Sequence, residues 1–280
     1  MLIFNDTVSM GDTLMTFPTV MEMLEQTPEP SKIYWTNPDV GSLFPYERYG
    51  AVFLQERVFD AERVARLSLH DYVWSRNGWN HSHGGFHEAA LTKHGFRVRA
   101  PAPVSVAFKH DPSVPTYDFI LAPHVLNNAW KNMQPAFWQC LIDALVHLFN
   151  ASVCIIGTSR LPSDENLLKI EYDLQRFKSP AYQAYNINKY LRGADYFWDE
   201  PLQRVAQLLS NVRVCFISVD SGPSHLMKAI RRPHIELFHD CLVLRHVEGE
   251  EQRVVDCRVL TIPVVLRTIA ELLAKHPCRG

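Results

Sequence analysis

Residues 214–230, VCFISVDSGPSHLMKAI, indicate the class of fold. The apolar first part of this stretch is typical of a buried strand, and Pro223 occupies a favourable first position for a helix. Asp220, Ser221 and Gly222 join the two elements. A strand, a short turn and a helix in this order form one unit of an α/β fold. Because the N-terminus of a helix favours negative charge, a diphosphate would fit at this turn.

Four residues beside this turn are candidate ligand contacts. Gly222 lets the main chain approach a ligand closely, and Ser221, Ser224 and His225 add side-chain donors. The alternative is that Asp220 and Ser221 only cap the helix, which is a common role for both residue types. The motif alone favours neither interpretation.

A second candidate site lies in residues 5–18, NDTVSMGDTLMTFP. A short apolar strand is expected at residues 2–4, and the apolar spacing of residues 13–26 predicts a helix. Asp12 would then lie at the carboxyl edge of the first strand, where it could accept a proton from a hydroxyl group. Helix capping by Asp12 is the competing interpretation, and spacing does not decide between the two.

A third, weaker candidate is Lys131, in the stretch NNAWKNMQPAFW at residues 127–138. It follows a strand predicted at residues 118–122 and could neutralise a phosphate at the end of that strand. A single lysine in a loop is more often only solvated, so both interpretations stay open.

Strand and helix patterns alternate along the whole chain. Further strands are predicted at residues 32–36, 50–54, 153–156, 194–198, 212–219 and 235–238, and further helices at residues 58–69, 86–94, 135–150, 161–177, 201–209, 223–231 and 263–275. The Pro-rich polar residues 109–117 have the character of a linker. We therefore predict two Rossmann-like α/β domains, residues 1–112 and residues 113–280, with a ligand in the cleft between them.

Composition excludes several classes of protein. Hydrophobic residues make up 47% and charged residues 21% of the 280 residues, as in ordinary globular proteins. With 28 Lys and Arg against 30 Asp and Glu, bulk charge does not favour nucleic-acid binding. The six scattered cysteines predict reduced thiols in the cytoplasm, and the lack of a long apolar run predicts that any membrane contact is peripheral. Phosphate-loop, dinucleotide and nucleophile-elbow motifs are absent from the sequence.

Three histidines fall within seven residues, HSHGGFH at residues 81–87. With Glu88 they could hold zinc, but we favour a polar loop near the cleft, with His83 on the acceptor side and no metal. The nearby aromatic residues, which we expect in the core rather than stacked on a sugar ring, are Trp74, Trp79 and Phe86.

Together, these segments and their order resemble glycosyltransferase family 9, the ADP-heptose:lipopolysaccharide heptosyltransferase family of GT-B fold. The residues that carry the resemblance are Ser9-Met10-Gly11-Asp12 with Leu14 and Pro18, then Lys131 with Pro135 and Trp138, and Asp220-Ser221-Gly222-Pro223-Ser224-His225-Leu226. The chain is shorter than is usual for this family between Gly50 and His87, so the first domain is expected to be trimmed. Gln134 stands where the family usually has an aromatic residue.

The resemblance implies an inverting, metal-independent glycosyltransferase that acts on a glycan or glycolipid, as in lipopolysaccharide biosynthesis, in the cytoplasm or at the inner face of the membrane. It implies a nucleotide-diphosphate sugar as co-substrate, with an ADP-sugar favoured and no further cofactor. Asp12 would be the catalytic base in the acceptor-side first domain, with Gly11 and Thr13 beside the acceptor. The residues implied for the donor, in the second domain, are Asn127, Lys131, Glu200, Asp220, Ser221, Gly222, Ser224 and His225.

A non-catalytic GT-B relative that binds a nucleotide sugar or a partner protein is the main alternative. Another enzyme of the same architecture that converts a nucleotide sugar without an acceptor, such as an epimerase or hydrolase, is a weaker one. The sugar, the base of the nucleotide, the acceptor and the oligomeric state are left open by the sequence.

Overall fold

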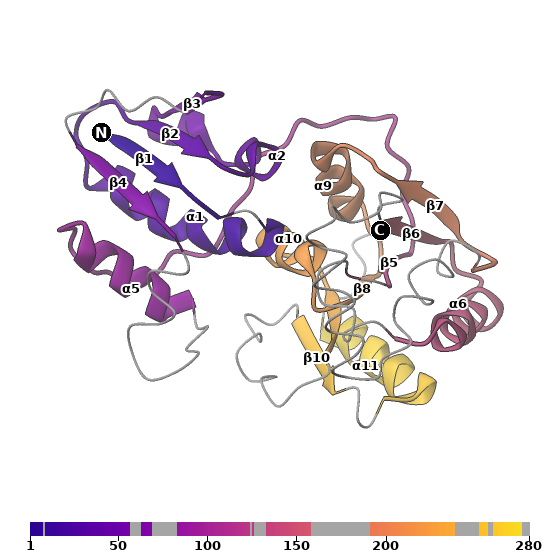
Figure 1. The fold of residues 1–280 in the computed structure, drawn as a ribbon. Helices are drawn as coiled ribbons and strands as arrows, with labels where there is room; N and C mark the ends of the chain where they lie inside the picture. The colour runs from indigo at the N-terminus through magenta and orange to yellow at the C-terminus, as the bar shows by residue number, and fades with distance from the viewer. Residues whose placement is uncertain are drawn as a thin grey trace, which may run out of the picture. The chain divides into compact units, whose positions relative to one another are not determined.

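The computed structural model forms two compact units, Met1–Lys109 and His110–Gly280 (Figure 1). The residues that it describes are 1–7, 9–56, 63–68, 83–123, 125, 133–157, 191–238, 252–256 and 260–275. Each unit is built on its own parallel sheet, which establishes the α/β fold class predicted from the sequence.

The first unit has a four-stranded sheet in the order β3-β2-β1-β4. Its strands are β1 (Leu2–Asn5), β2 (Lys32–Trp35), β3 (Val52–Leu54) and β4 (Val64–Leu67), and its helices are α1 (Met10–Glu25), α2 (Pro38–Gly41), α3 (Tyr46–Tyr49) and α5 (His83–Lys93). All strand pairs in this sheet are parallel. The carboxyl ends of β1 and β2 therefore meet at one edge, where α1 begins.

The core of the first unit lies between this sheet and α1. Phe17 of α1 contacts Trp35 of β2, with ring centroids 5.1 Å apart, and Phe44, at 5.2 Å. All three rings are buried. Thr19 of α1 bonds to His87 of α5, which joins the two longer helices of this unit. The apolar face of α1 thereby fixes the helix against the sheet, and with it the position of the first turn.

The second unit has a six-stranded parallel sheet in the order β10-β9-β8-β5-β6-β7. Its strands are β5 (Phe119–Ala122), β6 (Val153–Gly157), β7 (Asp195–Trp198), β8 (Cys215–Val219), β9 (His234–Phe238) and β10 (Gln252–Asp256). Its helices are α6 (Pro135–Phe149), α9 (Leu202–Ser210), α10 (Gly222–Ile230) and α11 (Ile262–Lys275). In chain order the first and fourth strands lie side by side, which is the strand order of a doubly wound Rossmann-like sheet.

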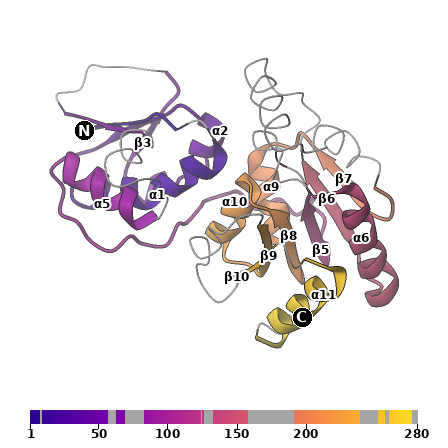
Figure 2. The same ribbon diagram turned by 60° about the horizontal axis from the view of Figure 1, so that its bottom comes forward.

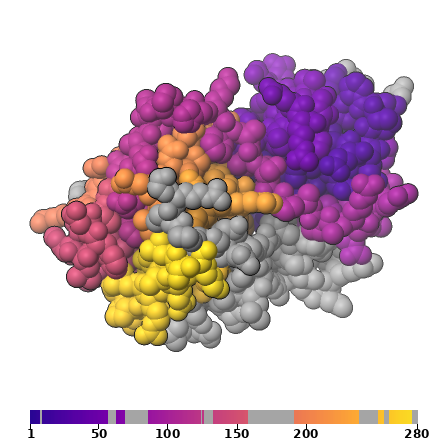
Figure 3. All heavy atoms as spheres, turned by 180° about the vertical axis from the view of Figure 1, so that it is seen from behind, coloured from indigo at the N-terminus to yellow at the C-terminus, as the bar shows by residue number. Residues whose placement is uncertain are grey.

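The two faces of this second sheet differ in character. Side chains of β5, β6, β8 and β9 on one face form an apolar core with α6 and α11, whereas α9 and α10 belong to the opposite face (Figure 2). Helix α11 buries Val265, Ile269 and Leu272 and exposes its other side, visible in yellow at the surface in Figure 3. The α10 face of the sheet is also largely apolar, with Ile120 and Phe216 fully buried, but it carries two buried polar residues, Ser218 and Glu236.

The structure corrects three features of the sequence prediction. The helix predicted at residues 58–69 is wrong where the structure describes it, because Val64–Leu67 forms β4 in register with β1. Strand β10 and the short helices α2 and α3 were not predicted. The helix predicted at residues 161–177 lies outside the described residues. The other predicted elements are present, with ends that differ by a few residues.

Candidate active site

The candidate donor site begins where the second sheet reverses its strand order. Strands β5 and β8 pair in parallel there, with Ala122 opposite Ser218, and the chain leaves both strands at the same edge. Asp220 follows β8 directly, and α10 begins two residues later at Gly222. Ligands of open α/β sheets bind at this kind of switch point, outside the carboxyl ends of the strands.

Ser221 is the N-cap residue of α10, but its side chain makes no capping hydrogen bond. Its hydroxyl group is buried, with 7% of the residue exposed, and has no partner within the described part of the chain. The backbone N–H groups of Ser224 and His225 both donate to the Ser221 carbonyl, and Pro223 has no N–H to offer. The Ser221 hydroxyl and the Gly222 N–H are therefore the donors that we expect to meet a ligand at this helix N-terminus.

Asp220 and His225 lie close together across this turn. His225 Nε2 is 3.9 Å from Asp220 Oδ1, and the two side chains are only 12% and 9% exposed. The His225 ring thus lies beside the N-terminus of α10, where an imidazole N–H can donate to a ligand. A helix N-terminus and a neighbouring imidazole donor together suit a phosphate group.

Ser224 does not present its hydroxyl group to this turn. The side chain is fully buried, and Oγ donates a hydrogen bond of 2.5 Å to Glu236 Oε2 in β9. The sequence indicated Ser221 and Ser224 alike as side-chain donors to a ligand, and the structure separates them. Glu236 was not found from the sequence, because nothing in its local pattern, HIELF, marks a functional residue.

Glu200 follows β7 and forms an ion pair with Arg204, one turn further along in α9, at 3.3 Å between Oε2 and Nε. Before it, Tyr196 and Trp198 stack with ring centroids 5.5 Å apart. Burial raises the pKa of Tyr196 to about 12. This part of the sheet therefore offers aromatic surface and a carboxylate at the carboxyl end of β7, which suits a nucleoside better than a phosphate.

In the first unit, Ser9 and not Asp12 caps α1. Ser9 Oγ accepts a hydrogen bond of 3.1 Å from the Asp12 backbone N–H. The capping interpretation of Asp12 is therefore wrong, and its half-buried carboxylate lies in the first turn of the helix beside Gly11. Thr13 is buried, and its hydroxyl group donates to the Ser9 carbonyl at 2.8 Å, so its side chain holds the loop.

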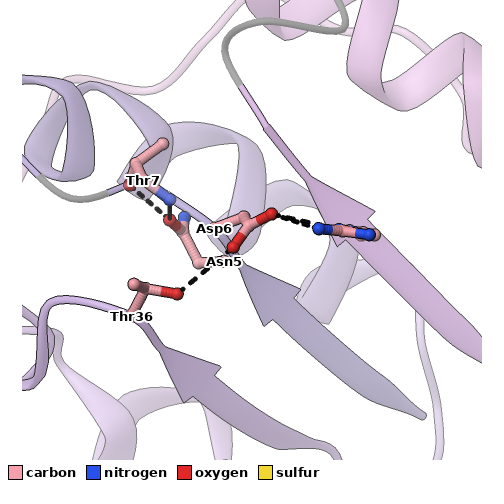
Figure 4. A network of polar contacts seen from close by, with 5 residues as sticks. Asn5, Asp6, Thr7 and Thr36 are labelled. Carbon is pink, nitrogen blue, oxygen red and sulfur yellow. Dashed lines mark hydrogen bonds and ion pairs between the residues drawn. The ribbon is translucent and has the colours of Figure 1, made fainter.

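A polar network that the sequence did not reveal supports this loop (Figure 4). Asn5 is buried at the end of β1; its Oδ1 accepts from the Thr7 N–H at 3.0 Å and from the Thr7 hydroxyl group, and its Nδ2 donates to Thr16 Oγ1 at 2.6 Å. Thr7 Oγ1 also lies 2.9 Å from Thr13 Oγ1. The network joins the end of β1 to the start of α1 on both sides of Asp12.

A second polar group lies at the same edge of the first sheet. Asp6 Oδ2 forms an ion pair with Arg66 of β4, and Asp6 Oδ1 accepts a hydrogen bond of 3.5 Å from Thr36 Oγ1, after β2. Asp6 and Thr36 face each other in Figure 4. These contacts tie β1, β2 and β4 together at the edge where α1 begins.

His87 is a structural residue. It is buried, Nδ1 lies 3.1 Å from Thr19 Oγ1 and Nε2 lies 3.0 Å from the Arg99 carbonyl, so both ring nitrogens have protein partners. Burial lowers the pKa of His87, which favours the neutral ring. In the described part of the chain, no group of three His, Cys, Asp or Glu residues is placed to hold a metal ion. Phe86 is buried, as expected for a core residue.

Several predicted site residues cannot be located. Asn127, Lys131, Trp74, Trp79 and His81 lie outside the described residues, and of His83 only the backbone is described, as the first residue of α5.

These features define a class of protein, an α/β protein of two Rossmann-like units with a candidate anion-binding turn in the second. Residues 200–243, which include β8, α10 and β9, match the model of the family described as glycosyltransferase family 9 (heptosyltransferase). The resemblance inferred from the sequence is confirmed by this match, and the class of enzyme predicted, a glycosyltransferase, is that of the matched family. No curated protein sequence matches the chain.

Solved structures share the fold at low sequence identity. Heptosyltransferase WaaC of Escherichia coli, solved with ADP, superposes with a TM-score of 0.67 and 16% identity over 97% of this chain and 99% of that one. The family 9 glycosyl transferase of Veillonella parvula gives 0.67 and 9% over 98% and 97%. TibC, described as an iron-containing dodecameric glycosyltransferase from enterotoxigenic Escherichia coli, gives 0.62 and 19% over 90% of this chain. This chain covers 61% of the TibC chain. The fold is therefore that of GT-B heptosyltransferases.

Proposed function

We propose that this protein transfers heptose or a similar sugar from a nucleotide-diphosphate sugar to a hydroxyl group of a glycan or glycolipid, with inversion and without a metal ion. The observation that carries the proposal is the turn at residues 220–225. It has a buried hydroxyl group that lacks a partner among the described residues, at a helix N-terminus, at the switch point of a Rossmann-like sheet. The same turn lies within the family 9 match.

ADP is the nucleotide that we favour. Structures of WaaC are described with ADP and with ADP-2-deoxy-2-fluoro heptose. In this chain the diphosphate would contact Ser221, Gly222 and His225, and the nucleoside would extend toward Glu200 at the end of β7. Asn127 and Lys131, assigned to the phosphates by family resemblance, would complete the donor site.

The reaction requires a base on one side of the sugar and charge stabilisation on the other. The acceptor oxygen attacks the anomeric carbon, and Asp12 takes the proton of that hydroxyl group. The bond from the anomeric carbon to the diphosphate oxygen breaks, and the departing nucleoside diphosphate keeps the electron pair. The N-terminus of α10 and an imidazole N–H of His225, in place before the reaction begins, would stabilise this negative charge.

The acceptor side would be formed by Gly11 and His83 of the first unit, and the buried Thr13 would support the loop. A lipopolysaccharide precursor is the acceptor that the family resemblance favours, which places the reaction in the cytoplasm or at the inner face of the membrane. No helix in the described residues has the length and apolarity needed to cross a membrane.

The first test is the variant Asp12→Asn. It should lower kcat for ADP release with ADP-heptose and a heptose-deficient lipopolysaccharide acceptor by about 10²- to 10⁴-fold, the usual contribution of a general base. Binding of ADP should stay within about twofold of the wild type, because Asp12 belongs to the other unit and touches no donor group in the proposal. Kinetics and isothermal titration calorimetry measure the two effects.

The matched control is Asp39→Asn, which makes the same change in the first turn of α2, where the carboxylate is exposed. It should leave both kcat and ADP binding unchanged. A fully active Asp12→Asn variant would show that another group is the base. A wild-type protein that binds ADP but transfers no sugar would instead support a non-catalytic relative.

A further inference from the structure

A buried carboxylate lies beneath α10. Glu236, in β9, is 0% exposed, and its Oε2 accepts from Ser224 Oγ at 2.5 Å and from Gln252 Nε2 at 3.3 Å. The same oxygen forms an ion pair with Lys228 Nζ at 3.1 Å, and the Lys228 side chain is itself only 8% exposed. Ser224 and Lys228 are four residues apart on α10 and therefore lie on one face of the helix. Two successive turns of α10 are thus attached to one carboxylate of the sheet.

Simple packing does not require this arrangement. Burying two charges costs free energy, and a well-packed apolar pair at such positions is often equally stable or more stable. The opposite face of the same sheet is packed in that apolar way, with Ile217 and Leu237 among the residues of the core. Hydrogen bonds and ion pairs have directions, however, so they fix the rotation of a helix about its axis more sharply than apolar contacts do.

The first turn of α10 is the part that this contact orients. Ser224 lies three residues after Ser221 and directly before His225, so its side chain fixes the turn that carries both proposed donor contacts. Ser224 points inward to Glu236, and the next residue, about 100° further around the helix, is His225, beside Asp220. A small rotation of this turn would move the Ser221 hydroxyl, the Gly222 N–H and the His225 ring together.

We propose that Glu236 is a positioning residue for the donor site, because through Ser224 and Lys228 it holds the first turn of α10 in the orientation that receives a diphosphate. The role rests on the proposed function. Glu236 is fully buried, so we expect it to act on the donor only through the residues of α10 that it holds.

The test uses two routes to remove the same contact. Ser224→Ala deletes the hydroxyl group of the first turn and leaves the pair of Lys228 and Glu236 intact, so the fold is retained. The double variant Lys228→Met, Glu236→Leu replaces both charges by apolar side chains of similar volume, which buried sites commonly tolerate. By isothermal titration calorimetry, each should raise the dissociation constants of ADP and of inorganic pyrophosphate about 10-fold. Combining all three substitutions should raise the dissociation constants by less than the product of the two separate effects, because Ser224, Lys228 and Glu236 form one network.

Two comparisons separate positioning from general stability. Ser224→Thr keeps a hydroxyl group and should restore most of the affinity for ADP. Ser152→Ala removes a similar bond, Ser152 Oγ to Asp118 Oδ2 at 2.8 Å, at the amino ends of β5 and β6 in the same unit. It should lower the unfolding temperature about as much as Ser224→Ala but leave both dissociation constants unchanged.

Two results would contradict the positioning role of Glu236, and only the second would also contradict the proposed function. If the wild type binds ADP and pyrophosphate, and the folded Ser224→Ala and double variants bind them equally well, Glu236 has no positioning role but the donor site stands. If the wild type binds neither probe, the proposed function itself is wrong, and the positioning role falls with it.

Discussion

His234 links the stability of the second unit to pH. It is 2% exposed at the start of β9, and burial together with the nearby charge of Lys228 lowers its pKa to about 3. An unfolded histidine has a pKa of about 6.5, so between these values the unfolded chain binds a proton that the folded chain does not. The free energy of unfolding should therefore fall as the pH drops below about 6.5, by up to about 1.4 kcal/mol per pH unit from this group.

The variant His234→Gln tests this assignment. Glutamine has a similar size and no charge to gain, so urea unfolding between pH 7 and pH 4.5 should show a slope smaller than that of the wild type by up to one proton. Carboxylates that titrate in the same range contribute equally to both proteins and cancel in the comparison. Identical slopes would show that His234 is charged in the folded state.

At the scale of single residues, the sequence could predict near which element a residue lies, but not which partner its side chain contacts. Asp12 and Asp220 were expected at the carboxyl ends of β1 and β8; Asp220 lies in the turn that follows β8, and Asp12 lies in the first turn of α1, the helix after β1. Ser221 and Ser224 could not be told apart, because the partner of Ser224 is Glu236, twelve residues away on another element. The sequence also could not show whether Ser9 or Asp12 caps α1, because both lie at the same helix N-terminus. The structure shows that Ser9 Oγ accepts from the Asp12 N–H.

At the scale of elements, Asn5 should decide how firmly α1 is held against β1. The variant Asn5→Leu keeps the side-chain volume but removes the bonds to Thr7 and Thr16, so the buried Thr7 N–H loses its acceptor Asn5 Oδ1. We expect a loss of about 2–4 kcal/mol in the free energy of unfolding of the first unit, measured with urea. Turnover should also fall, since the network supports both sides of Asp12, while ADP affinity should not change.

The matched comparison is Asn37→Ala, which removes the cap bond from Val40 N–H to Asn37 Oδ1 in α2. It should cost about 1 kcal/mol and leave turnover intact, because α2 carries no proposed catalytic group. Equal effects of the two substitutions would mean that the Asn5 network has no special relation to Asp12.

Elements with a long or strongly apolar pattern were predictable, and short ones were not. Helices α1, α6 and α11 each show several turns of apolar spacing. Strands β5 and β8 are buried throughout and β6 is buried except at Gly157, so their patterns are unambiguous. Strand β4 has only four residues, VARL, and alternates exposed with buried positions. Ala, Arg and Leu favour helices, so this segment becomes a strand only because β1 offers it hydrogen bonds.

At the scale of the whole molecule, the strand order of the second sheet explains why the location of the candidate donor site was predictable. The hydrogen bonds within the site were not. The loops after β5 and β8 leave the same edge because the two strands are parallel neighbours. An alternation of strands and helices is enough to predict such an edge, since crossovers between parallel strands have one handedness. The sequence does not reveal the polar layer between β9 and α10, because its members become neighbours only after folding.

ADP should therefore stabilise one unit and not the other. The two units have separate sheets and cores, and the proposed donor contacts all belong to the second, His110–Gly280. At a concentration 100 times its dissociation constant, a ligand raises the free energy of unfolding of its site by about 2.7 kcal/mol. For a unit of this size that corresponds to about 5–10 °C in Tm.

Hydrogen exchange read by mass spectrometry resolves the effect by element. Binding suppresses only those opening reactions that expose the site, so amides in β8 and α10 should exchange about 10- to 100-fold more slowly with ADP, whereas those in β1 and α1 should not change. The Ser152→Ala variant should show the same pattern, because its donor site is intact. Equal slowing in both units would mean that ADP binding also stabilises the first unit. The helix that carries Asp12 would then be affected by donor binding alone, without an acceptor.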